Sequence, residues 1–508
     1  MAGWGSGYVV DTAYVHDFCR VQVPPMLSFA ALAGGVEAPG AAGEALAYCD
    51  LGCGQGYTAN LIAAANPAAQ VLGIDFNPSH IANARALATA ARLSNVDFRE
   101  ASFEEIAADP TMPPFDLMAM HGVFGWVSAR NRQALVELIG RCLKPGGLLY
   151  VSYDCMPGWA GVAPLRRIMA RSFASRAGSP SPAALERAIA YSDSLRAADA
   201  RFHRMFPNVE AQIERLKSTP RAYLAHELLT RDWEAFSFGQ VADALAEAKL
   251  TYVGSAYLTD GVDRVNFTEA QQAMLAGLDD PILREETRDM LLARQFRRDV
   301  FAKGIPDTSP RRIRARWLDT RFAMTSMQKD FDMTFDTPIG KLQLRPDVHA
   351  PLIERLRKGP VTLREAIDGL PQPAANWGSI ADAIKVLVGR GDLQPALPAG
   401  GDAARAASVR AFNAAVLERA MDRAEFGYLA SPVTGGAVRV DRVAQLYLFA
   451  RQRGMADPAQ MLATLAQDGP PTGGGTAPSA ETARAFAQSE TARIEADVLP
   501  VLEKLGID

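Results

Sequence analysis

Between Ala47 and Tyr153, short apolar runs alternate with helical segments, and this alternation constrains the fold more than any other feature. Such a pattern is typical of a parallel, doubly wound sheet, in which a helix connects each strand to the next. The runs are nearly continuous in apolar residues, as expected of strands covered on both faces. The runs predicted as strands are Leu46–Leu51, Val71–Phe76, Val96–Ala101, Phe115–Met120 and Leu148–Tyr153. We therefore predict an α/β fold built on a doubly wound sheet.

The segment between the last two runs is predicted to be an amphipathic helix. Ser128 is a suitable N-cap residue, and apolar side chains recur on one face at Leu135, Leu138, Ile139 and Leu143. The sequence Lys144-Pro145-Gly146-Gly147 is predicted to form the turn that ends this helix.

The chain has 508 residues, which is too many for a single hydrophobic core. We expect mostly helical parts after the sheet, with a strand-like stretch at Leu250–Leu258 and a winged-helix outline over Leu342–Leu397. The predicted division is a helical arm (1–45), the sheet domain (46–160), a helical connector (161–220), a further domain (221–304), a winged-helix-like domain (305–400) and a C-terminal helical region (401–508) with a flexible loop at 468–480.

The chemistry is predicted to lie in the loop that follows the first strand. Its sequence is Asp50-Leu51-Gly52-Cys53-Gly54-Gln55-Gly56, and a helix begins directly after it. Glycines let the backbone approach a ligand closely, and the helix N-terminus favours a carboxylate or a phosphate. Asp50 would repel a pyrophosphate, but it can accept a hydrogen bond from an ammonium group. The loop therefore fits the methionine part of S-adenosylmethionine better than a dinucleotide.

Three further positions favour a nucleoside ligand. Asp75 ends the second strand, about 20 residues beyond the loop, where an acid can accept hydrogen bonds from both ribose hydroxyls. Phe76 follows it directly. Ser102 and Phe103, after the third strand, can flank an adenine by a hydrogen bond and an apolar contact. The competing interpretation is a glycine-rich turn that merely packs tightly.

The chain resembles class I S-adenosylmethionine-dependent methyltransferases, which have a Rossmann-like sheet. The features that match are the Asp-x-Gly-x-Gly-x-Gly loop, Asp75 and the Leu-Lys-Pro-Gly-Gly turn. Further stretches are similar to bacterial methyltransferases that carry a methyltransferase regulatory domain. They are 7–14, 121–128, 152–159, 223–233, 252–256, 294–299 and 428–432. The resemblance covers nearly the whole chain and places the regulatory domain at 221–304. The best-understood relatives with this layout are bacterial outer-membrane-protein lysine methyltransferases.

The resemblance implies S-adenosylmethionine as cofactor, a protein acceptor and a homodimer. Tyr8 and Tyr14 are candidates for closing over the cofactor, although an N-terminal arm that only packs is equally compatible with the sequence. One residue departs from the pattern. The family leads us to expect Asn after the tyrosine that ends the fifth strand, whereas this chain has Asp154. The acceptor is therefore not fixed by the resemblance.

Candidate catalytic residues follow the fourth and fifth strands, where open α/β sheets bind ligands. His121 is a candidate general base, a candidate cofactor contact together with Gly122, or a packing residue. Tyr153 and Asp154 are predicted to face the same crevice, and Asp154 can hold an ammonium group or cap a turn. Trp126 and Trp159 can wall an acceptor channel and contact a cation through their faces, or simply pack.

Composition argues against several classes of protein. The net charge of −4 and a winged-helix-like region with nearly balanced charges make nucleic acid an improbable partner. Arg311, Arg312, Arg314 and Arg316 are interpreted as a solvated helix face rather than a binding patch. We expect no secretory signal, membrane insertion, disulfide or metal site, and a cytoplasmic location.

The leading functional hypothesis is a protein methyltransferase that acts on lysine. Two alternatives stay open, namely a small-molecule methyltransferase and a non-catalytic S-adenosylmethionine sensor. A nucleic-acid methyltransferase is a weaker option.

Overall fold

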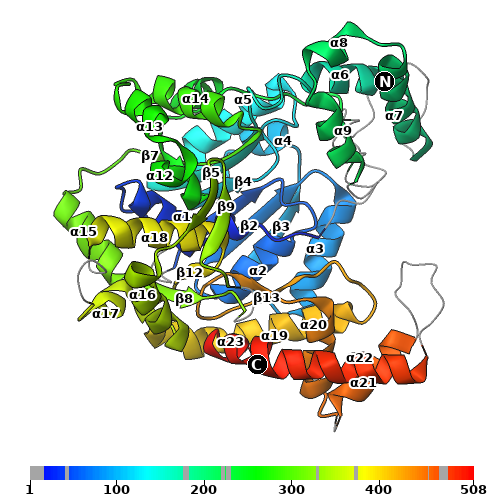
Figure 1. Cartoon of the computed structure of the whole chain (residues 1–508), viewed down its shortest axis with the longest axis vertical. Coiled ribbons are helices and arrows are strands. Elements are labelled where there is room, and N and C mark those ends of the chain that lie inside the picture. Colours follow the sequence, from blue (N-terminus) through cyan, green and yellow to red (C-terminus); the bar gives the residue numbers. More distant parts are fainter. Residues whose placement is uncertain are drawn as a thin grey trace.

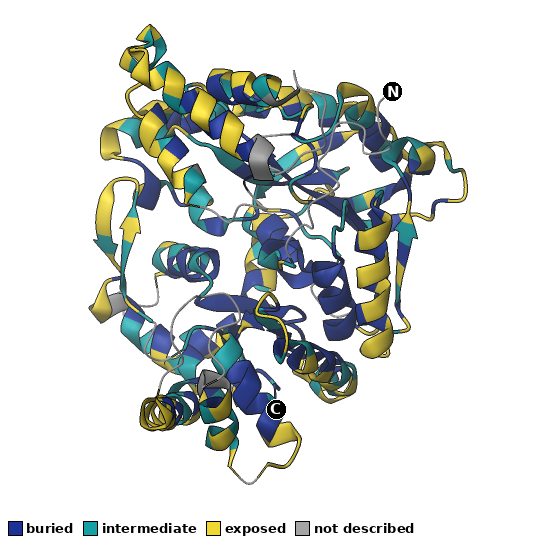
Figure 2. Cartoon of the chain, turned by 90° about the vertical axis from the view of Figure 1, so that its right-hand side faces the viewer, coloured by how far each residue is buried: buried dark blue, intermediate teal, exposed yellow. Residues whose placement is uncertain are grey.

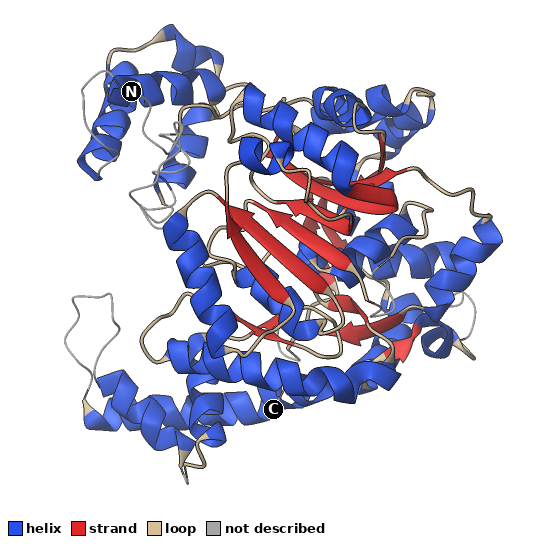
Figure 3. Ribbon diagram, turned by 180° about the vertical axis from the view of Figure 1, so that it is seen from behind, coloured by secondary structure: helices blue, strands red, loops and turns tan. Residues whose placement is uncertain are grey.

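A central sheet lies in the middle of the molecule, between helices (Figure 3). It has seven strands in the order β3-β2-β1-β4-β5-β7-β6. The computed structural model describes residues 16–39, 45–174, 182–218, 224, 230–327, 331–370, 376–455, 457–467 and 479–507. The strands are β1 (Ala47–Leu51), β2 (Gln70–Asp75), β3 (Val96–Glu100), β4 (Phe115–Met120), β5 (Leu143–Asp154), β6 (Leu250–Ser255) and β7 (Phe296–Lys303).

The five predicted strands correspond to β1–β5, and adjacent members of this set pair in parallel. β1 lies between β2 and β4, so the connection order reverses at this point. In open α/β sheets, ligands bind at the carboxyl ends of the strands beside such a reversal. The predicted doubly wound sheet is thereby confirmed, and the reversal marks the crevice in which to look for a site.

β5 begins earlier than expected, at Leu143. Phe115 of β4 pairs with Leu143 and Leu117 pairs with Leu148, so residues 144–147 bulge out within the strand. Gly146 has a φ of 81°, which suits glycine at this turn. Leu143 therefore belongs to the strand and not, as predicted, to the preceding helix.

The sheet extends beyond the predicted boundary at residue 160, because β6 and β7 come from residues that we assigned to a separate domain. β7 pairs antiparallel with β5 over its whole length, from Leu148↔Ala302 to Asp154↔Phe296, and β6 pairs antiparallel with β7. The continuous apolar run of β5 is thus covered at its edge by a strand that lies about 150 residues later in the sequence.

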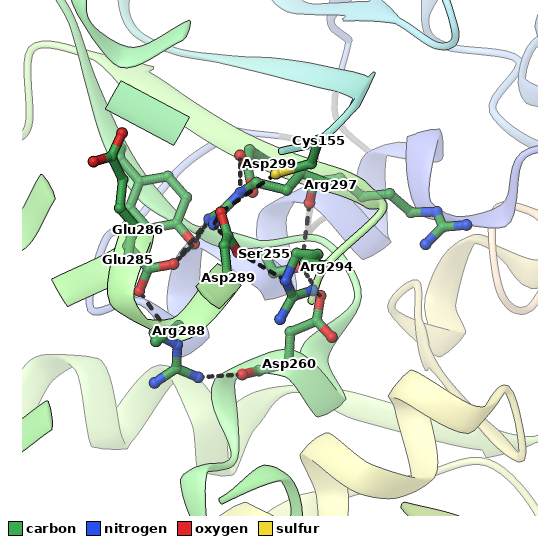
Figure 4. A network of polar contacts seen from close by, with 12 residues as sticks. Cys155, Ser255, Asp260, Glu285, Glu286, Arg288, Asp289, Arg294, Arg297 and Asp299 are labelled. Carbon is green, nitrogen blue, oxygen red and sulfur yellow. Dashed lines mark hydrogen bonds and ion pairs between the residues drawn. The ribbon is translucent and has the colours of Figure 1, made fainter. Parts of the chain in front are cut away.

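A buried network of charged side chains joins β7 to its neighbours (Figure 4). Arg297 is 3% exposed, and its guanidinium lies 2.8 Å from carboxylate oxygens of Asp299, Asp289 and Glu285. The hydroxyl of Tyr153 on β5 donates to Asp299 at 2.7 Å. Because buried charges are costly unless they are paired, this arrangement fixes β5, β7 and the helix that carries Glu285 and Asp289 relative to one another.

Helices cover both faces of the sheet. On one face lie α1 (Pro24–Ala33), α2 (Tyr57–Ala65) and α3 (Pro78–Ala90), in an apolar core that includes Tyr48 and Tyr150. On the other lie α4 (Phe103–Ala108), α5 (Ala129–Cys142) and α11 (Phe238–Ala246), in a core that includes Cys49 and Val151. The central strands are mainly buried, whereas the outer helices alternate between buried and exposed residues (Figure 2).

A small helical unit follows β5 and has its own apolar core. It consists of α6 (Ala163–Ala174), α7 (Pro182–Ala197), α8 (Arg201–Met205) and α9 (Val209–Lys217). The segment between β6 and β7 contains the 3-10 helix η2 (Leu258–Gly261), α12 (Asp263–Asn266), α13 (Glu269–Ala276) and α14 (Pro281–Leu292).

After β7 the chain forms a three-stranded sheet of order β11-β8-β12 and a separate hairpin of β9 and β10. The elements are α15 (Pro310–Asp319), β8 (Arg321–Met324), β9 (Thr334–Thr337), β10 (Gly340–Gln343), α16 (Pro346–Lys358), β11 (Val361–Thr362), α17 (Leu363–Ile367), α18 (Trp377–Arg390) and β12 (Leu393–Ala396).

The C-terminal elements form a layer beside α2, drawn in orange to red in Figure 1. The Tyr57 hydroxyl of α2 donates to the carbonyl of Tyr428, and the Asn66 amide donates to the carbonyl of Gly435. The elements are η4 (Ala399–Gly401), α19 (Asp402–Ala420), β13 (Tyr428–Ala430), β14 (Ala437–Arg439), α20 (Arg442–Gln452), α21 (Pro458–Gln467), α22 (Ala480–Arg493), the π-helical turn η5 (Ile494–Val498) and α23 (Leu499–Lys504).

Candidate functional site

The glycine loop turns sharply between β1 and α2. Gly52, Gly54 and Gly56 have φ values of 75°, 54° and 70°, a region that L side chains rarely adopt. A Cβ atom on Gly52 would lie 2.5 Å from Cγ2 of Val123. A Cβ atom on Gly56 would lie 2.3 Å from the Cβ of Ala84 and would also meet the ring of Phe98. Gly52 thus brings the loop close to the chain after β4, whereas Gly56 allows α2 to pack against α3.

The two predicted acids end neighbouring strands, and their surroundings differ. Asp75 accepts hydrogen bonds from the backbone N–H groups of Gly54 at 3.0 Å and Asn77 at 2.9 Å. Its Oδ1 also lies 3.2 Å from Nδ1 of His80, a partner that the sequence analysis missed. Asp75 is therefore fixed by one contact to the glycine loop and two contacts to the start of α3.

Asp50 is 3% exposed, and none of the described residues donates a hydrogen bond to it. Burial, together with the nearby charge of Asp75, raises the pKa of the Asp50 carboxyl to about 7. A buried carboxylate without a donor is costly, so such a group normally has a cationic or hydrogen-bonding partner. The α-ammonium group of S-adenosylmethionine is a suitable partner, and the residues of this loop fit that cofactor.

The other residues predicted to bind the cofactor follow β1, β2 and β3, and their side chains make different contacts. The Ser102 hydroxyl caps α4, where it accepts from the N–H of Glu105 and donates to its carboxylate. The ring of Phe103 reaches within 3.8 Å of the Cβ position of Gly52, so it borders the glycine loop. The Cys53 thiol lies against Gly73 of β2, behind the loop. Phe76 follows β2 and is half-buried.

His121 follows β4 and faces side chains of β5. Its Nδ1 atom lies 2.8 Å from the Tyr150 hydroxyl and 3.0 Å from Oγ of Ser152. The residue as a whole is exposed, but Nδ1 is enclosed by these groups. Desolvation there, with the charge of Arg298 adding to it, lowers the pKa of His121 to about 4, so the imidazole is neutral at pH 7. The backbone N–H of Gly122 donates to the same Ser152 oxygen.

The N-terminal segment reaches this histidine. Cys19 Sγ lies 3.5 Å from His121 Nδ1, and the Cys19 backbone N–H donates to Oγ1 of Thr58 on α2. Tyr8 and Tyr14 precede this segment and lie outside the described residues.

The prediction that Tyr153 faces the crevice has to be corrected. Side chains alternate along a strand, so Tyr150 and Ser152 point towards His121 while Tyr153 points to the opposite face. There it is fully buried, and its hydroxyl donates to Asp299. Tyr153 therefore belongs to the buried network around Arg297 and Asp299.

Asp154 shares the face of Ser152 and is surrounded by tryptophans. Its Oδ2 accepts from Nε1 of Trp233 at 2.6 Å, and the rings of Trp159 and Trp233 lie 5.0 Å apart. Burial raises the pKa of Asp154 to about 6, against the lowering effects of the Trp233 hydrogen bond and the Arg166 charge. The Arg166 guanidinium lies over the rings of Trp233, at 4.1 Å, and Trp126, at 5.8 Å. We call Asp154, Trp126, Trp159, Trp233 and Arg166 the tryptophan cluster.

Sequence reasoning missed Arg166 and the contact of Trp233 with Asp154, because both residues come from segments well beyond β5. Ser152 was detectable, since it precedes Asp154 by two residues and must share its face.

Across the described ranges, no helix combines the length and the apolar character needed to span a bilayer. No group of three or more His, Cys, Asp or Glu side chains there is arranged to hold a metal ion. All five cysteines are free thiols.

Similarity to known proteins agrees with this geometry. Residues 42–204 match the family described as a methyltransferase domain, and residues 220–303 match a predicted methyltransferase regulatory domain. The chain is 35% identical over 506 residues to the uncharacterized protein sll1526 of Synechocystis sp., covering 99% of both chains. It is also 34% identical over 136 residues to a trans-aconitate 2-methyltransferase of Methylobacterium nodulans, covering 25% of this chain and 49% of that protein.

Among solved structures, the chain is similar to PKMT2 from Rickettsia typhi in complex with AdoHcy, with a TM-score of 0.68 at 16% identity, over 94% of this chain and 97% of that chain. At this identity the likeness shows a shared fold. The matched domains, the sheet and the glycine loop together identify an enzyme that uses S-adenosylmethionine. The chain belongs to the family of S-adenosylmethionine-dependent methyltransferases that carry a methyltransferase regulatory domain.

Proposed function

We propose that this enzyme methylates lysine side chains of a protein. The observation that carries the proposal is the tryptophan cluster, in which the buried carboxylate of Asp154 lies among indole rings on the same strand face as Ser152 and His121. Aromatic faces attract cations, and a carboxylate can accept a hydrogen bond or a proton from an ammonium group. A lysine side chain, with a long apolar stem and a terminal amine, matches such a site.

The cofactor residues have separate roles in this proposal. S-Adenosylmethionine supplies an electrophilic methyl group on a sulfonium when it is bound. The Asp50 carboxylate accepts from its ammonium group. Gly52, Cys53 and Gly54 form the tight turn that lets the cofactor approach the backbone, while their own N–H groups donate to Ile74 and Asp75. Asp75 accepts from the ribose, while Phe76, Phe103 and Gly122 line the nucleoside. His121 is neutral and lines the cofactor on the side of β4.

The acceptor side requires proximity and a neutral amine. Asp154 lies two residues beyond Ser152, which corresponds to roughly 7 Å along the strand. An amine held between Asp154 and the cofactor crevice is therefore close enough for in-line attack on a methyl group. Free lysine has a pKa of about 10.4, so the site must also favour loss of the proton.

The fold of PKMT2 extends over almost the whole chain, which supports a protein acceptor. A small-molecule acceptor is the second candidate, because the N-terminal part is similar to trans-aconitate 2-methyltransferases. A homodimer and a cytoplasmic location complete the proposal, and sedimentation of the purified protein tests the former.

The deciding experiment is transfer of labelled methyl from S-adenosylmethionine into a cell extract that is then separated into protein, nucleic-acid and small-molecule fractions. Label in protein that is recovered as methyl-lysine after hydrolysis supports the proposal. Label confined to small molecules supports the second candidate. Cofactor binding without transfer to any fraction indicates a sensor.

The variant that tests the role of Asp154 is Asp154→Asn. It should keep the affinity for S-adenosylmethionine and lower turnover about tenfold or more, because the amide is a poor proton acceptor. Asp97→Asn is the control, since Asp97 is exposed on β3 and its carboxylate accepts from the backbone N–H of its neighbour Phe98. Equal turnover of Asp154→Asn and Asp97→Asn would contradict the role of Asp154.

A further inference from the structure

Arg166 is a buried cation beside the proposed acceptor site. It projects from α6 and is 2% exposed. Its guanidinium lies over the Trp233 ring at 4.1 Å, and one nitrogen donates to the carbonyl of Thr230 at 3.4 Å. A guanidinium that is held in this way keeps its charge at any physiological pH, since its ordinary pKa is above 12.

Trp233 connects this charge to Asp154. One face of its indole carries Arg166, while its Nε1 donates to Asp154 Oδ2 at 2.6 Å. The ring is rigid, so a single side chain sets the separation between the cation and the carboxylate. Arg166 acts in opposition to burial, because its positive charge lowers the pKa of Asp154 whereas desolvation raises it.

We propose that Arg166 is a positioning residue for proton removal from the acceptor amine, and this inference rests on the proposed lysine acceptor. Its fixed charge keeps the Asp154 carboxylate ionised and disfavours a second positive charge in the same pocket. An incoming ammonium group thus meets an ionised carboxylate that can accept its proton, and the neutral amine that remains is not repelled by Arg166.

The acceptor R–NH3+ and the Asp154 carboxylate become R–NH2 and the protonated carboxyl. The nitrogen lone pair then forms the bond to the methyl carbon, the carbon–sulfur bond breaks, and its electron pair remains on sulfur. The product R–NH2–CH3+ retains the positive charge, and Asp154 returns its proton to solvent.

Several other charged side chains of the described segments around Asp154 form ion pairs with one another. Arg132 pairs with Glu234 at 2.7 Å, and Arg231 pairs with Asp232 at 3.1 Å. Arg297 and Asp299 of β7 pair with each other on the opposite side of the sheet, where Tyr153 points. Among the described residues, Arg166 is the charge that acts on the titration of Asp154.

Tryptophan fluorescence tests the electrostatic part without any acceptor. Indole emission responds to a nearby charge, and Trp233 is bonded directly to Asp154. The fluorescence of the wild-type enzyme should titrate near pH 6. The chain has six tryptophans, so loss of this titration in Asp154→Asn is what shows that it reports on Asp154. Arg166→Met should shift its midpoint upward by about one pH unit. Arg166→Lys should shift it less, since the charge is retained.

Arg167→Met is the control on the same helix, because Arg167 is exposed and should leave the midpoint unchanged. The binding constant for S-adenosylmethionine shows that each variant is folded. An Arg166→Met midpoint equal to that of the wild type would overturn the inference.

The second readout is the pH profile of methyl-lysine formation. Its acidic limb should move upward in Arg166→Met by the same amount as the fluorescence midpoint. A shifted midpoint with an unshifted acidic limb would overturn the role in proton removal. If the wild-type enzyme forms no methyl-lysine at all, the proposed function fails, while the fluorescence titration still decides whether Arg166 acts on Asp154.

Discussion

The backbone N–H of Gly54 donates to Oδ2 of Asp75 across 3.0 Å, so the glycine loop is tied to the end of the second strand before any ligand is considered. Asp50, one strand away, has no such donor among the described residues. The two acids of the cofactor site therefore differ in their roles. Asp75 holds the glycine loop in place, whereas the Asp50 carboxylate is left to bind a cationic group of the ligand.

Replacing Asp75 with Ala should weaken S-adenosylmethionine binding about tenfold to a hundredfold. The change removes both the proposed ribose acceptor and the partner of the Gly54 N–H, and hydrogen bonds to charged groups contribute about 1.5–3 kcal/mol. Calorimetric titration measures this affinity. Asp97→Ala on the exposed side of β3 is the control, and an unchanged affinity in Asp75→Ala would refute the placement.

The affinity for S-adenosylmethionine should fall as the pH drops below about 7. The pKa of Asp50 is raised to about 7, so its carboxyl gains a proton below that value and can no longer pair with an ammonium group. Each further pH unit should cost about tenfold in affinity. Titrations between pH 5.5 and 8.5 check this, and Asp50→Asn should bind weakly at every pH without the slope.

The same substitution should stabilise the ligand-free protein. A carboxyl whose pKa is raised on folding binds more protons in the folded state, so stability is lost as the pH rises from about 4 to 7 and the full cost remains above 7. The raised pKa corresponds to a cost of the order of 4 kcal/mol at pH 8. Thermal unfolding should show a higher midpoint for Asp50→Asn at pH 8 and a smaller difference near pH 4.5. A lower midpoint at pH 8 would contradict the burial argument.

Gly56→Ala should be more damaging to stability than Gly122→Ala. Both residues have positive φ values, 70° and 62°, which cost a non-glycine residue about 1–2 kcal/mol. Only Gly56 is also enclosed, with the Cβ of Ala84 at 2.3 Å from the new atom, whereas Gly122 has nothing within 4 Å. The difference should appear as a lower unfolding temperature for Gly56→Ala. Equal effects would mean that α2 and α3 can separate at no cost.

Arg297→Met should be strongly destabilising, by about 3–5 kcal/mol, because it leaves the buried carboxylates of Asp289 and Asp299 and the partly buried carboxylate of Glu285 without their shared cation. Acidic pH should recover part of the loss as Asp289 and Asp299, whose pKa values are raised by burial, gain protons. Arg312→Met is the control, since Arg312 pairs with Glu37 on the exposed side of α15 and such pairs contribute little. Denaturant unfolding at pH 5 and pH 8 distinguishes the two variants.

The sheet could be predicted from the sequence because each of its first five strands is a local apolar run followed by a helix. Asp50 and Asp75 were predictable for the same reason, since the ends of adjacent parallel strands meet at one edge. The pairing of β7 with β5 was not predictable in this way, because it depends on two segments about 150 residues apart.

The acceptor side was harder to predict for a related reason. Alternation along β5 assigns Ser152 and Asp154 to one face and Tyr153 to the other, and applying that rule to Tyr153 would have avoided the error. Arg166 gave no such signal. Its position over Trp233 results from the packing of α6 against the loop before α11, which no short motif encodes.

The pairing of β5 with β7 limits how this enzyme can be divided. A fragment that stopped at residue 217 would keep the entire cofactor loop, yet it would expose the backbone of Leu148–Asp154 along an apolar strand that now has a partner. Open edges of this kind associate with one another, so such a fragment should aggregate rather than act as a minimal enzyme. The part of the chain that family comparison names regulatory therefore also covers the edge of the catalytic sheet.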